Sequence, residues 1–280
     1  MQNLDYLVEC NFTEAVDTLD KNYVAHPKCE MFLLLHGDVT VLINSQKYRV
    51  HDGALILLST RDMHLALNNT PYTYRRITMH FDPKVVQMFN TKNTNLLSCF
   101  NIASSSHRNI IYLDGDQVKT YTEFASKIAP YWGSKSYGDD LTAISSLLSL
   151  LVYVNQLYRT QTAPAPLPCS PLITDLVSYI DANLDEALTI KKLAQQFSYS
   201  EAYLSALFSK QMGVPLKYFI NTKKIAYAKQ LLQGSCSVMQ ACDRCGFNDY
   251  SNFIRAFKKI VGLPPHQWKK EQQAKLVLRK

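Results

Sequence analysis

The C-terminal part of the chain repeats one pattern of apolar and polar positions at an offset of 49 residues. Residues 200–208 and 249–257 each place a polar capping residue before a run with apolar positions at helical spacing. A glycine follows each run, Gly213 or Gly262, and a proline two residues later opens the next helix. The repeat therefore predicts two similar helical units side by side.

Each copy has the pattern of a helix-turn-helix whose second helix, 201–212 or 250–261, keeps one face free for a DNA major groove. Arg pairs bidentately with guanine and Asn with adenine, so Arg255 and Asn252 are the sharpest candidates for base reading. The first copy offers small or acidic side chains, and we expect the second to carry more of the specificity. The predicted base-reading residues are Glu201, Ala202, Ser205, Ala206, Tyr250, Ser251, Asn252 and Arg255.

Lysines around both units are candidates for phosphate contacts, which add affinity without sequence choice. The alternative for each is a solvated helix face. The predicted phosphate contacts are Lys210, Lys223, Lys224, Lys258, Lys259, Lys269 and Lys270.

The N-terminal part shows a different pattern, with short apolar or alternating runs separated by turns. These runs predict strands and a small barrel or sandwich. They are residues 31–35, 39–43, 47–50, 54–59 and 72–81.

Helical periodicity follows at residues 121–131 and 139–159. The second segment has a 3-4 spacing that resembles coiled-coil positions, with Asn155 at an a position, where a polar residue can fix the register of two partner helices. It predicts a homodimer through the 139–159 helix. The alternative is a helix packed on its own barrel.

Pro164, Pro166, Pro168 and Pro171 make residues 161–171 a semi-rigid linker. We therefore expect an effector-binding and dimerisation domain at 1–160 and a DNA-binding domain at 172–280.

The charge distribution agrees with this division. Residues 172–280 carry 16 Lys and Arg against 8 Asp and Glu, whereas residues 1–171 carry 14 against 15. Such an excess suits a domain that meets phosphates. The seven scattered cysteines suit a reducing compartment, and Met1–Glu9 has no signal-peptide pattern. Polar residues interrupt the most apolar stretch, 141–158, so we expect no membrane span and a cytoplasmic protein.

Residues 188–268 resemble the DNA-binding domain of the AraC/XylS family of bacterial transcription regulators. The match is closest over 246–259, Gly-Phe-Asn-Asp-Tyr-Ser-Asn-Phe-Ile-Arg-Ala-Phe-Lys-Lys, followed by Gly262-Leu-Pro-Pro265 and Trp268, where a Tyr is common. The resemblance implies two helix-turn-helix units, joined by a long helix, that enter successive grooves of double-stranded DNA. It also implies a transcription activator, with RNA polymerase as a further partner.

The N-terminal segment resembles a cupin, a double-stranded β-helix barrel common in sugar-responsive members of that family. His26, Glu30 and Gly37 resemble part of the first cupin motif, and Gly53, His64 and Asn68 the second. Val24 stands in place of the first metal-binding His, and Ser59 and Arg61 replace the usual Pro and Gly.

The three remaining ligands, His26, Glu30 and His64, could hold a divalent ion or hydrogen-bond the hydroxyls of a sugar. The resemblance favours a small-molecule effector, a sugar, and we predict no metal and no cofactor. The segment before Asn22 is a hypothetical movable arm over the pocket. The predicted effector-binding residues are His26, Glu30, Tyr48, His64, Arg76 and His80.

These features predict a ligand-responsive, sequence-specific transcription regulator of carbohydrate-related genes that is not an enzyme. The alternative is a metal-dependent cupin enzyme with an accessory helical domain, which the absence of the first His disfavours. Cys242-x-x-Cys245 has no second Cys pair at zinc-finger spacing, and both cysteines fall on the inward side of the predicted helix.

Overall fold

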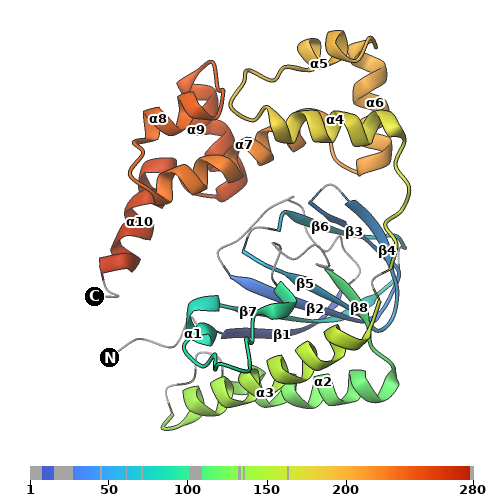
Figure 1. The fold of residues 1–280 in the computed structure, drawn as a ribbon, viewed down its shortest axis with the longest axis vertical. Coiled ribbons are helices and arrows are strands. Elements are labelled where there is room, and N and C mark those ends of the chain that lie inside the picture. Colours follow the sequence, from blue (N-terminus) through green and yellow to red (C-terminus); the bar gives the residue numbers. More distant parts are fainter. Residues whose placement is uncertain are drawn as a thin grey trace. The chain divides into compact units, whose positions relative to one another are not determined.

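The structure is a computed structural model that describes residues 8–15, 28–44, 46–60, 62–70, 72–100, 109–131, 134, 136–162 and 164–277, with side chains up to Glu271. The described residues form two compact units that divide between Leu167 and Pro168, inside the Pro-rich segment. The first unit combines strands and helices, and the second is helical (Figure 1).

The strands of the first unit pair in two antiparallel sheets. The five-stranded sheet has the order β1 (Val8–Ala15), β7 (Tyr74–Phe81), β2 (Cys29–His36), β5 (Ala54–Leu58) and β8 (Ile110–Tyr112). The three-stranded sheet has the order β4 (Gln46–Val50), β3 (Val39–Ile43) and β6 (His64–Asn68).

The prediction of a closed barrel is wrong for the described residues, because no ladder joins the two sheets into a ring. The turn between β2 and β3 and the turn between β4 and β5 each carry the chain from one sheet to the other. Gly37 and Gly53 take positive φ values of 134° and 84° at these corners, a conformation that suits glycine. Alternation along the sequence identified strands but not their neighbours, which is why the closure was mispredicted.

Apolar side chains cover both faces of the central strand β2. Met31 and Leu33 pack in a core shared with the helices, whereas Phe32 and Leu34 pack in a second core against the three-stranded sheet. Successive residues of a strand point to opposite faces. The first unit therefore has three layers: helices, five-stranded sheet and three-stranded sheet.

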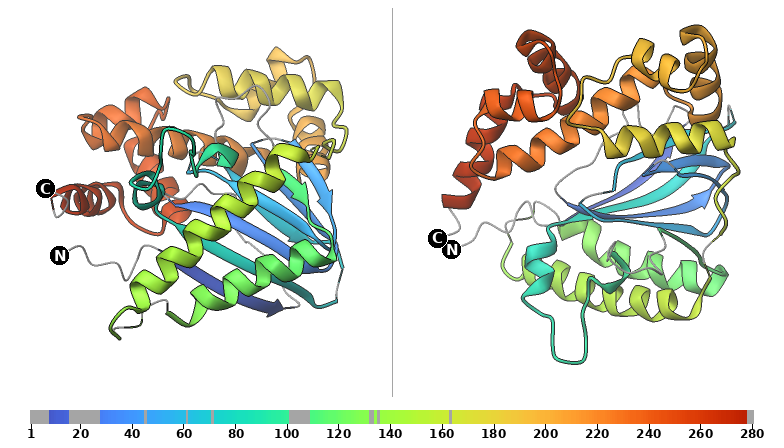
Figure 2. Two further views of the ribbon diagram at one scale, coloured as in Figure 1. Left: turned by 60° about the horizontal axis from the view of Figure 1, so that its bottom comes forward. Right: turned by 45° about the horizontal axis from the view of Figure 1, so that its top comes forward.

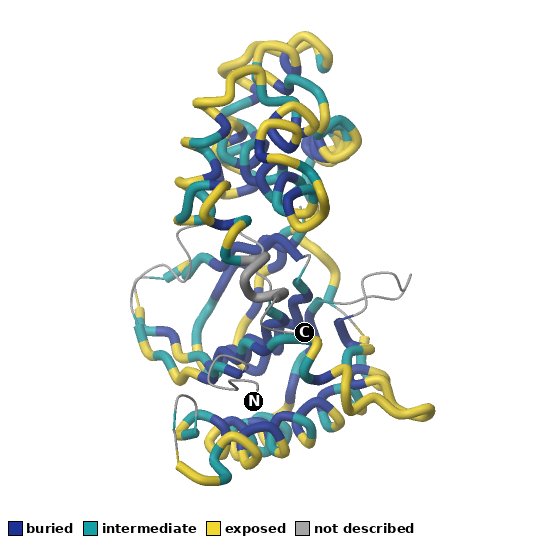
Figure 3. The backbone as a smooth tube through the Cα atoms, turned by 90° about the vertical axis from the view of Figure 1, so that its left-hand side faces the viewer, coloured by how far each residue is buried: buried dark blue, intermediate teal, exposed yellow. Residues whose placement is uncertain are grey.

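The helical layer consists of α2 (Gly115–Ile128) and α3 (Asp139–Thr160), which lie across one face of the five-stranded sheet (Figure 2). Asp114 and Gln117 form a capping box at the start of α2. Both helices are buried along the side toward the sheet and exposed along the other (Figure 3). Shorter elements are α1 (Pro83–Gln87), η1 (Ser98–Phe100) and η2 (Ala129–Tyr131).

Strand β1 was missed by the sequence analysis. It pairs along its whole length with β7, from Val8 opposite Phe81 to Ala15 opposite Tyr74. Residues 8–15 of the hypothetical arm are therefore an edge strand of the sheet. Their apolar side chains Val8 and Cys10 are buried in the core shared with the helices, which fixes the strand in place.

The second unit contains seven helices in its described residues, and its repeat is the one predicted. The bounds are α4 (Pro171–Ala182), α5 (Ile190–Gln196), α6 (Glu201–Met212), α7 (Leu216–Gln233), α8 (Val238–Arg244), α9 (Tyr250–Val261) and α10 (Pro265–Val277). Ser200 caps α6 and Asp249 caps α9 by accepting a backbone N–H three residues on, and Gly213 and Gly262 end these helices at φ values of 76° and 85°.

Candidate nucleic-acid interface and effector site

Helix α9 follows the turn after α8 and buries one face in the core of the second helix-turn-helix. Phe253 and Phe257 are fully buried, and Phe257 meets Trp268 edge-on with ring centroids 5.9 Å apart. The opposite face is open, and Arg255 donates from Nη2 to Asn252 Oδ1 at 2.5 Å. The four predicted base-reading residues of this helix, Tyr250, Ser251, Asn252 and Arg255, are exposed.

Helix α6 occupies the equivalent position in the first helix-turn-helix. Leu204 and Phe208 are fully buried, while Glu201, Ala202 and Ala206 are exposed and Ser205 is half-buried. The predicted face is therefore open on both helices. Whether these residues contact bases stays a prediction.

Two tyrosines beside this face were missed. Tyr199 and Tyr203 are 46% and 50% exposed and stack with ring centroids 5.2 Å apart. The 49-residue offset already pairs Tyr203 with Asn252, which is the signal that could have found it. The first recognition face is therefore more aromatic than its small and acidic residues suggested.

The predicted phosphate lysines fall into two groups. Lys210, Lys258, Lys259 and Lys270 are exposed. By contrast, Lys269 is half-buried and donates to the carbonyl of Cys236 at 2.6 Å.

The prediction for Lys224 is wrong, and Lys223 is engaged elsewhere. Lys223 is 11% exposed in its side chain and forms an ion pair of 2.9 Å with Asp181. Lys224 is buried, and its ammonium donates to the carbonyl oxygens of Glu186 at 2.5 Å and Gly246 at 2.7 Å. Burial lowers the pKa of Lys224 to about 8. Helical periodicity alone did not show that this face of α7 meets two loops.

Lys224 thereby joins the two helix-turn-helix units. Glu186 lies just before α5 of the first helix-turn-helix. Gly246 makes the turn between α8 and α9 of the second helix-turn-helix. An ideal Cβ on Gly246 would lie 2.2 Å from Glu186 O, so these backbones touch directly. Helix α7 therefore carries a fixed connection between the units.

Cys242 and Cys245 are buried, as the helical pattern predicted. Burial raises the pKa of Cys245 to about 12. All seven cysteines are free, and no group of three or more His, Cys, Asp or Glu among the described residues could hold a metal ion.

In the first unit, three predicted effector residues meet between the sheets. Glu30 Oε2 lies 3.2 Å from His64 Nε2 and 3.4 Å from His80 Nε2. Nδ1 of His64 lies 3.1 Å from the carbonyl of Asp62, which can only accept, so His64 donates there. The second contact of His64 then needs a proton on Nε2 or on Glu30. A hydrogen-bonded carboxyl–imidazole cluster is therefore built into the fold.

The other predicted effector residues differ in position. Arg76 lies across the rings of Phe32 and Tyr74, at 5.3 and 5.7 Å from their centroids. Tyr48 belongs to the apolar core between the sheets, and its hydroxyl donates to Gln46 Oε1 at 2.6 Å. His26 lies outside the described residues.

The dimer prediction assigned Asn155 a role that the structure contradicts. Its Oδ1 accepts from Cys99 N at 3.0 Å, and its Nδ2 donates to Leu96 O at 2.9 Å and Leu151 O at 2.8 Å. The side chain anchors the loop at η1 of its own chain and cannot fix the register of a partner helix. Among the described residues, α3 is a helix that is long enough and apolar enough to span a membrane, by length and composition alone. Its buried face packs in the core shared with α2 and the sheet.

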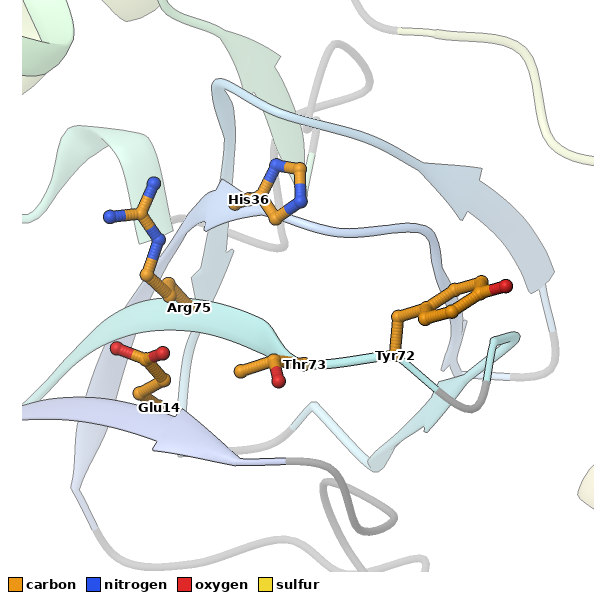
Figure 4. Close-up of a pocket in the computed structure, with 5 residues that line it drawn as sticks. All are labelled: Glu14, His36, Tyr72, Thr73 and Arg75. Atoms are coloured by element: carbon orange, nitrogen blue, oxygen red, sulfur yellow. The ribbon is translucent and has the colours of Figure 1, made fainter.

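A groove of about 380 Å³ lies at the edge of the first unit, on the ends of β1, β2 and β7 (Figure 4). None of its residues was singled out from the sequence. His36 is held there by Asp52 Oδ2 at 3.1 Å. The groove is lined by Glu14, His36, Tyr72, Thr73 and Arg75.

The chain is similar to known proteins in its helix-turn-helix repeat and over most of its length. Residues 193–271 match the family described as helix-turn-helix domain. The chain is 23% identical over 256 residues to the HTH-type transcriptional activator RhaR of Escherichia coli strain K12, which covers 87% of this chain and 85% of RhaR. Among solved structures, ToxT of Vibrio cholerae O395 covers 94% of this chain and 96% of its own, at 11% identity and a TM-score of 0.38. The C-terminal domain of AraT, a response regulator of Geobacillus stearothermophilus, covers 38% and 88%, at 23% identity and a TM-score of 0.36.

Two linked helix-turn-helix units with exposed second helices define a DNA-binding transcription regulator. The helix-turn-helix match covers the repeat, and the similarity to RhaR extends over the first unit as well. The chain is therefore similar to transcription regulators of the AraC/XylS type over its helix-turn-helix repeat, and to RhaR over most of its length.

Proposed function

We propose that this protein is an effector-responsive activator whose helices α6 and α9 enter successive major grooves of a promoter. The observation that carries the proposal is the open face on both second helices. Similarity to an activator, RhaR, supports activation and hence contact with RNA polymerase. Seven free thiols support a cytoplasmic location.

The DNA-binding half of the proposal is tested by selecting binding sequences from random duplexes with the full-length protein. Arg255→Ala should lose about 1–3 kcal/mol at one guanine and leave the other positions unchanged. Lys259→Ala is the matched control from the same helix, since its exposed ammonium is assigned to a phosphate. It should weaken all sequences alike and lower the slope of log K against log salt by about 0.9. A uniform loss for Arg255→Ala would contradict its assignment to a base.

We also propose that the first unit is a cupin-like effector domain that dimerises through α3. The outer face of this helix carries Leu141, 66% exposed, and Val152, 40% exposed, with half-buried Leu148 between them. We assign a second copy of α3 to this face, because a two-fold dimer pairs the same apolar surface of both protomers.

Sedimentation of the full chain tests the dimer. Leu141→Asp with Val152→Asp should give a monomer, whereas Asp at exposed Gln156 or Thr160 should leave the dimer intact. A wild-type monomer at micromolar concentration would refute this part of the proposal.

A further inference from the structure

The five-stranded sheet carries an unusual set of polar side chains on the face that points away from the helices. The register of β1, β7 and β2 aligns them in three rows. Glu9 stands beside His80 and Glu30, Asn11 beside Thr78 and Phe32, and Thr13 beside Arg76 and Leu34. We call these the polar wall: Glu9, Asn11, Thr13, Glu30, Arg76, Thr78 and His80.

Alternation fixes the direction of the wall. Val8 and Cys10 of β1 and Ile77 and Met79 of β7 belong to the core on the helix side. The residues between them therefore face the opposite way, toward the side of the three-stranded sheet. Buried polar groups on such a face are costly unless they are hydrogen-bonded, so the partners of each charge decide what the wall can bind.

Both acids of the wall already have basic partners. Lys28 Nζ lies 2.6 Å from Glu9 Oε1. The imidazoles of His64 and His80 lie 3.2 and 3.4 Å from Glu30 Oε2. A cationic ligand group would compete with these partners for its counter-charge. A carboxylate has about four acceptor sites, however, so each acid can still accept from a neutral hydroxyl.

Arg76, unlike these two acids, has a side-chain atom without a partner in the part of the chain that the structure describes. Its guanidinium lies over Phe32 and Tyr74, and its buried Nε has no hydrogen-bond partner among the described residues. A guanidinium offers five donors in a fork that fits a carboxylate or phosphate. One end of the wall thus presents a positive fork, and the other presents acceptors.

We propose that the effector is a hydroxylated carboxylic acid of monosaccharide size, that is, a sugar acid, with its carboxylate on Arg76 and its hydroxyls toward Glu9, Glu30 and His80. This inference rests on the proposed effector role of the first unit and adds the ligand's charge and polarity. The Cα atoms of Arg76 and His80 are four residues apart on one strand, about 13 Å. A hexose-sized ring and an extended arginine side chain together span that length. A neutral sugar would leave the fork of Arg76 unmatched, and a plain fatty acid would leave the acceptor end unmatched.

The neighbouring residue Arg75 provides the matched control. It lies on the same strand, but it points to the other face and lines the groove of Figure 4 with Glu14. Arg75→Met removes the same charge from the same strand without touching the polar wall. It also tests the groove itself. A ligand held in the groove would bind more weakly to Arg75→Met and would bind Arg76→Met as tightly as wild type.

The experiment measures the melting temperature and then Kd of the full-length protein with galacturonate, glucuronate and gluconate. Galactose, glucose and hexanoate, each lacking the carboxylate or the hydroxyls, are the comparison probes. We expect at least one sugar acid to raise the melting temperature of wild type. Arg76→Met should weaken its Kd at least about 10-fold, Arg76→Lys should lose less, and Arg75→Met should match wild type.

Three outcomes would overturn the proposal, and they can be told apart. Stabilisation by galactose or glucose that survives Arg76→Met keeps an effector domain but refutes the anionic ligand. Stabilisation by hexanoate equal to that by gluconate refutes the role of the hydroxyls. No stabilisation by any of the sugar acids refutes the sugar-acid class, and the DNA selection above still decides the regulator function by itself. If Arg76→Met lowers the melting temperature without ligand, Arg76→Lys carries the comparison.

Discussion

The prediction that follows most directly from the structure concerns Lys224, the buried ammonium between the two helix-turn-helix units. Replacing it by methionine keeps most of its apolar length and removes two donors, those to Glu186 O and Gly246 O. The Glu186 oxygen keeps a second donor, Leu188 N at 2.9 Å, so the main loss falls on Gly246.

Hydrogen bonds from a charged donor contribute about 1.5–3 kcal/mol each, and an acceptor left without a partner costs about 1–3 kcal/mol. The wild-type ammonium is itself disfavoured by burial, which lowers its pKa to about 8 and offsets part of that gain. We therefore expect Lys224→Met to lower the free energy of unfolding of the helical unit by about 2–3 kcal/mol.

Urea denaturation followed by far-ultraviolet circular dichroism and tryptophan fluorescence measures this change. We expect the two units to unfold in separate transitions, and the transition that a bound duplex shifts to higher urea belongs to the helical unit. Lys223→Met is the control: its exposed partner Asp181 makes it worth less than about 1 kcal/mol.

DNA binding gives a second measurement, since Lys224 holds the two recognition helices at one separation. Lys224→Met should weaken a duplex with both half-sites by about 10-fold and a duplex with one half-site far less. Equal stability of the two lysine variants, within about 0.5 kcal/mol, would refute the connection we assign to Lys224.

Three further predictions rest on single contacts. Gly246→Ala should lower the melting temperature of the helical unit more than Lys224→Met does, because a Cβ there would lie 2.2 Å from Glu186 O at a φ of 60°; circular dichroism measures it, and a melting temperature equal to wild type would contradict the close approach. Asn155→Leu should cost the first unit about 2–4 kcal/mol through lost backbone contacts without changing the sedimentation coefficient, and a shift to monomer would restore its role between protomers. Burial raises the pKa of Cys10 and Cys29 to about 12, whereas the thiols of the unfolded chain ionise at about pH 8.5. The free energy of unfolding of the first unit should therefore be highest below about pH 8 and fall as the pH rises to about 10. Replacing both cysteines by alanine should flatten that fall in urea titrations.

The second unit could be predicted closely from the sequence because its signals are local. A capping residue, an apolar stripe and a glycine stop lie within a dozen residues, and Asp249 and Gly262 act as their positions suggested. Lys224 was misassigned because its burial depends on loops 38 and 22 residues away in the chain. Local periodicity shows which side of a helix is polar but not what packs on it.

The first unit was harder because its order is non-local. The strands from β2 to β5 were found, but their pairing into two sheets depends on register between distant segments. His80 could be suggested as a pocket residue, yet its alignment with Glu9 required β1, whose alternation in Val8–Ala15 is short and irregular. Asn155 fitted a heptad and instead bonds to residues 56 and 59 positions earlier.

Among the described strands, β1 stands at the edge of its sheet and pairs with β7 alone, and yet it carries Glu9, Asn11 and Thr13. Edge strands separate at lower free energy than central ones. In the proposed effector site, ligand binding and pairing of this strand are consequently linked equilibria: a molecule that bridges β1 and β7 must slow amide hydrogen exchange along Val8–Ala15. The strand that completes the site is also the one whose exchange rate would report that it is filled.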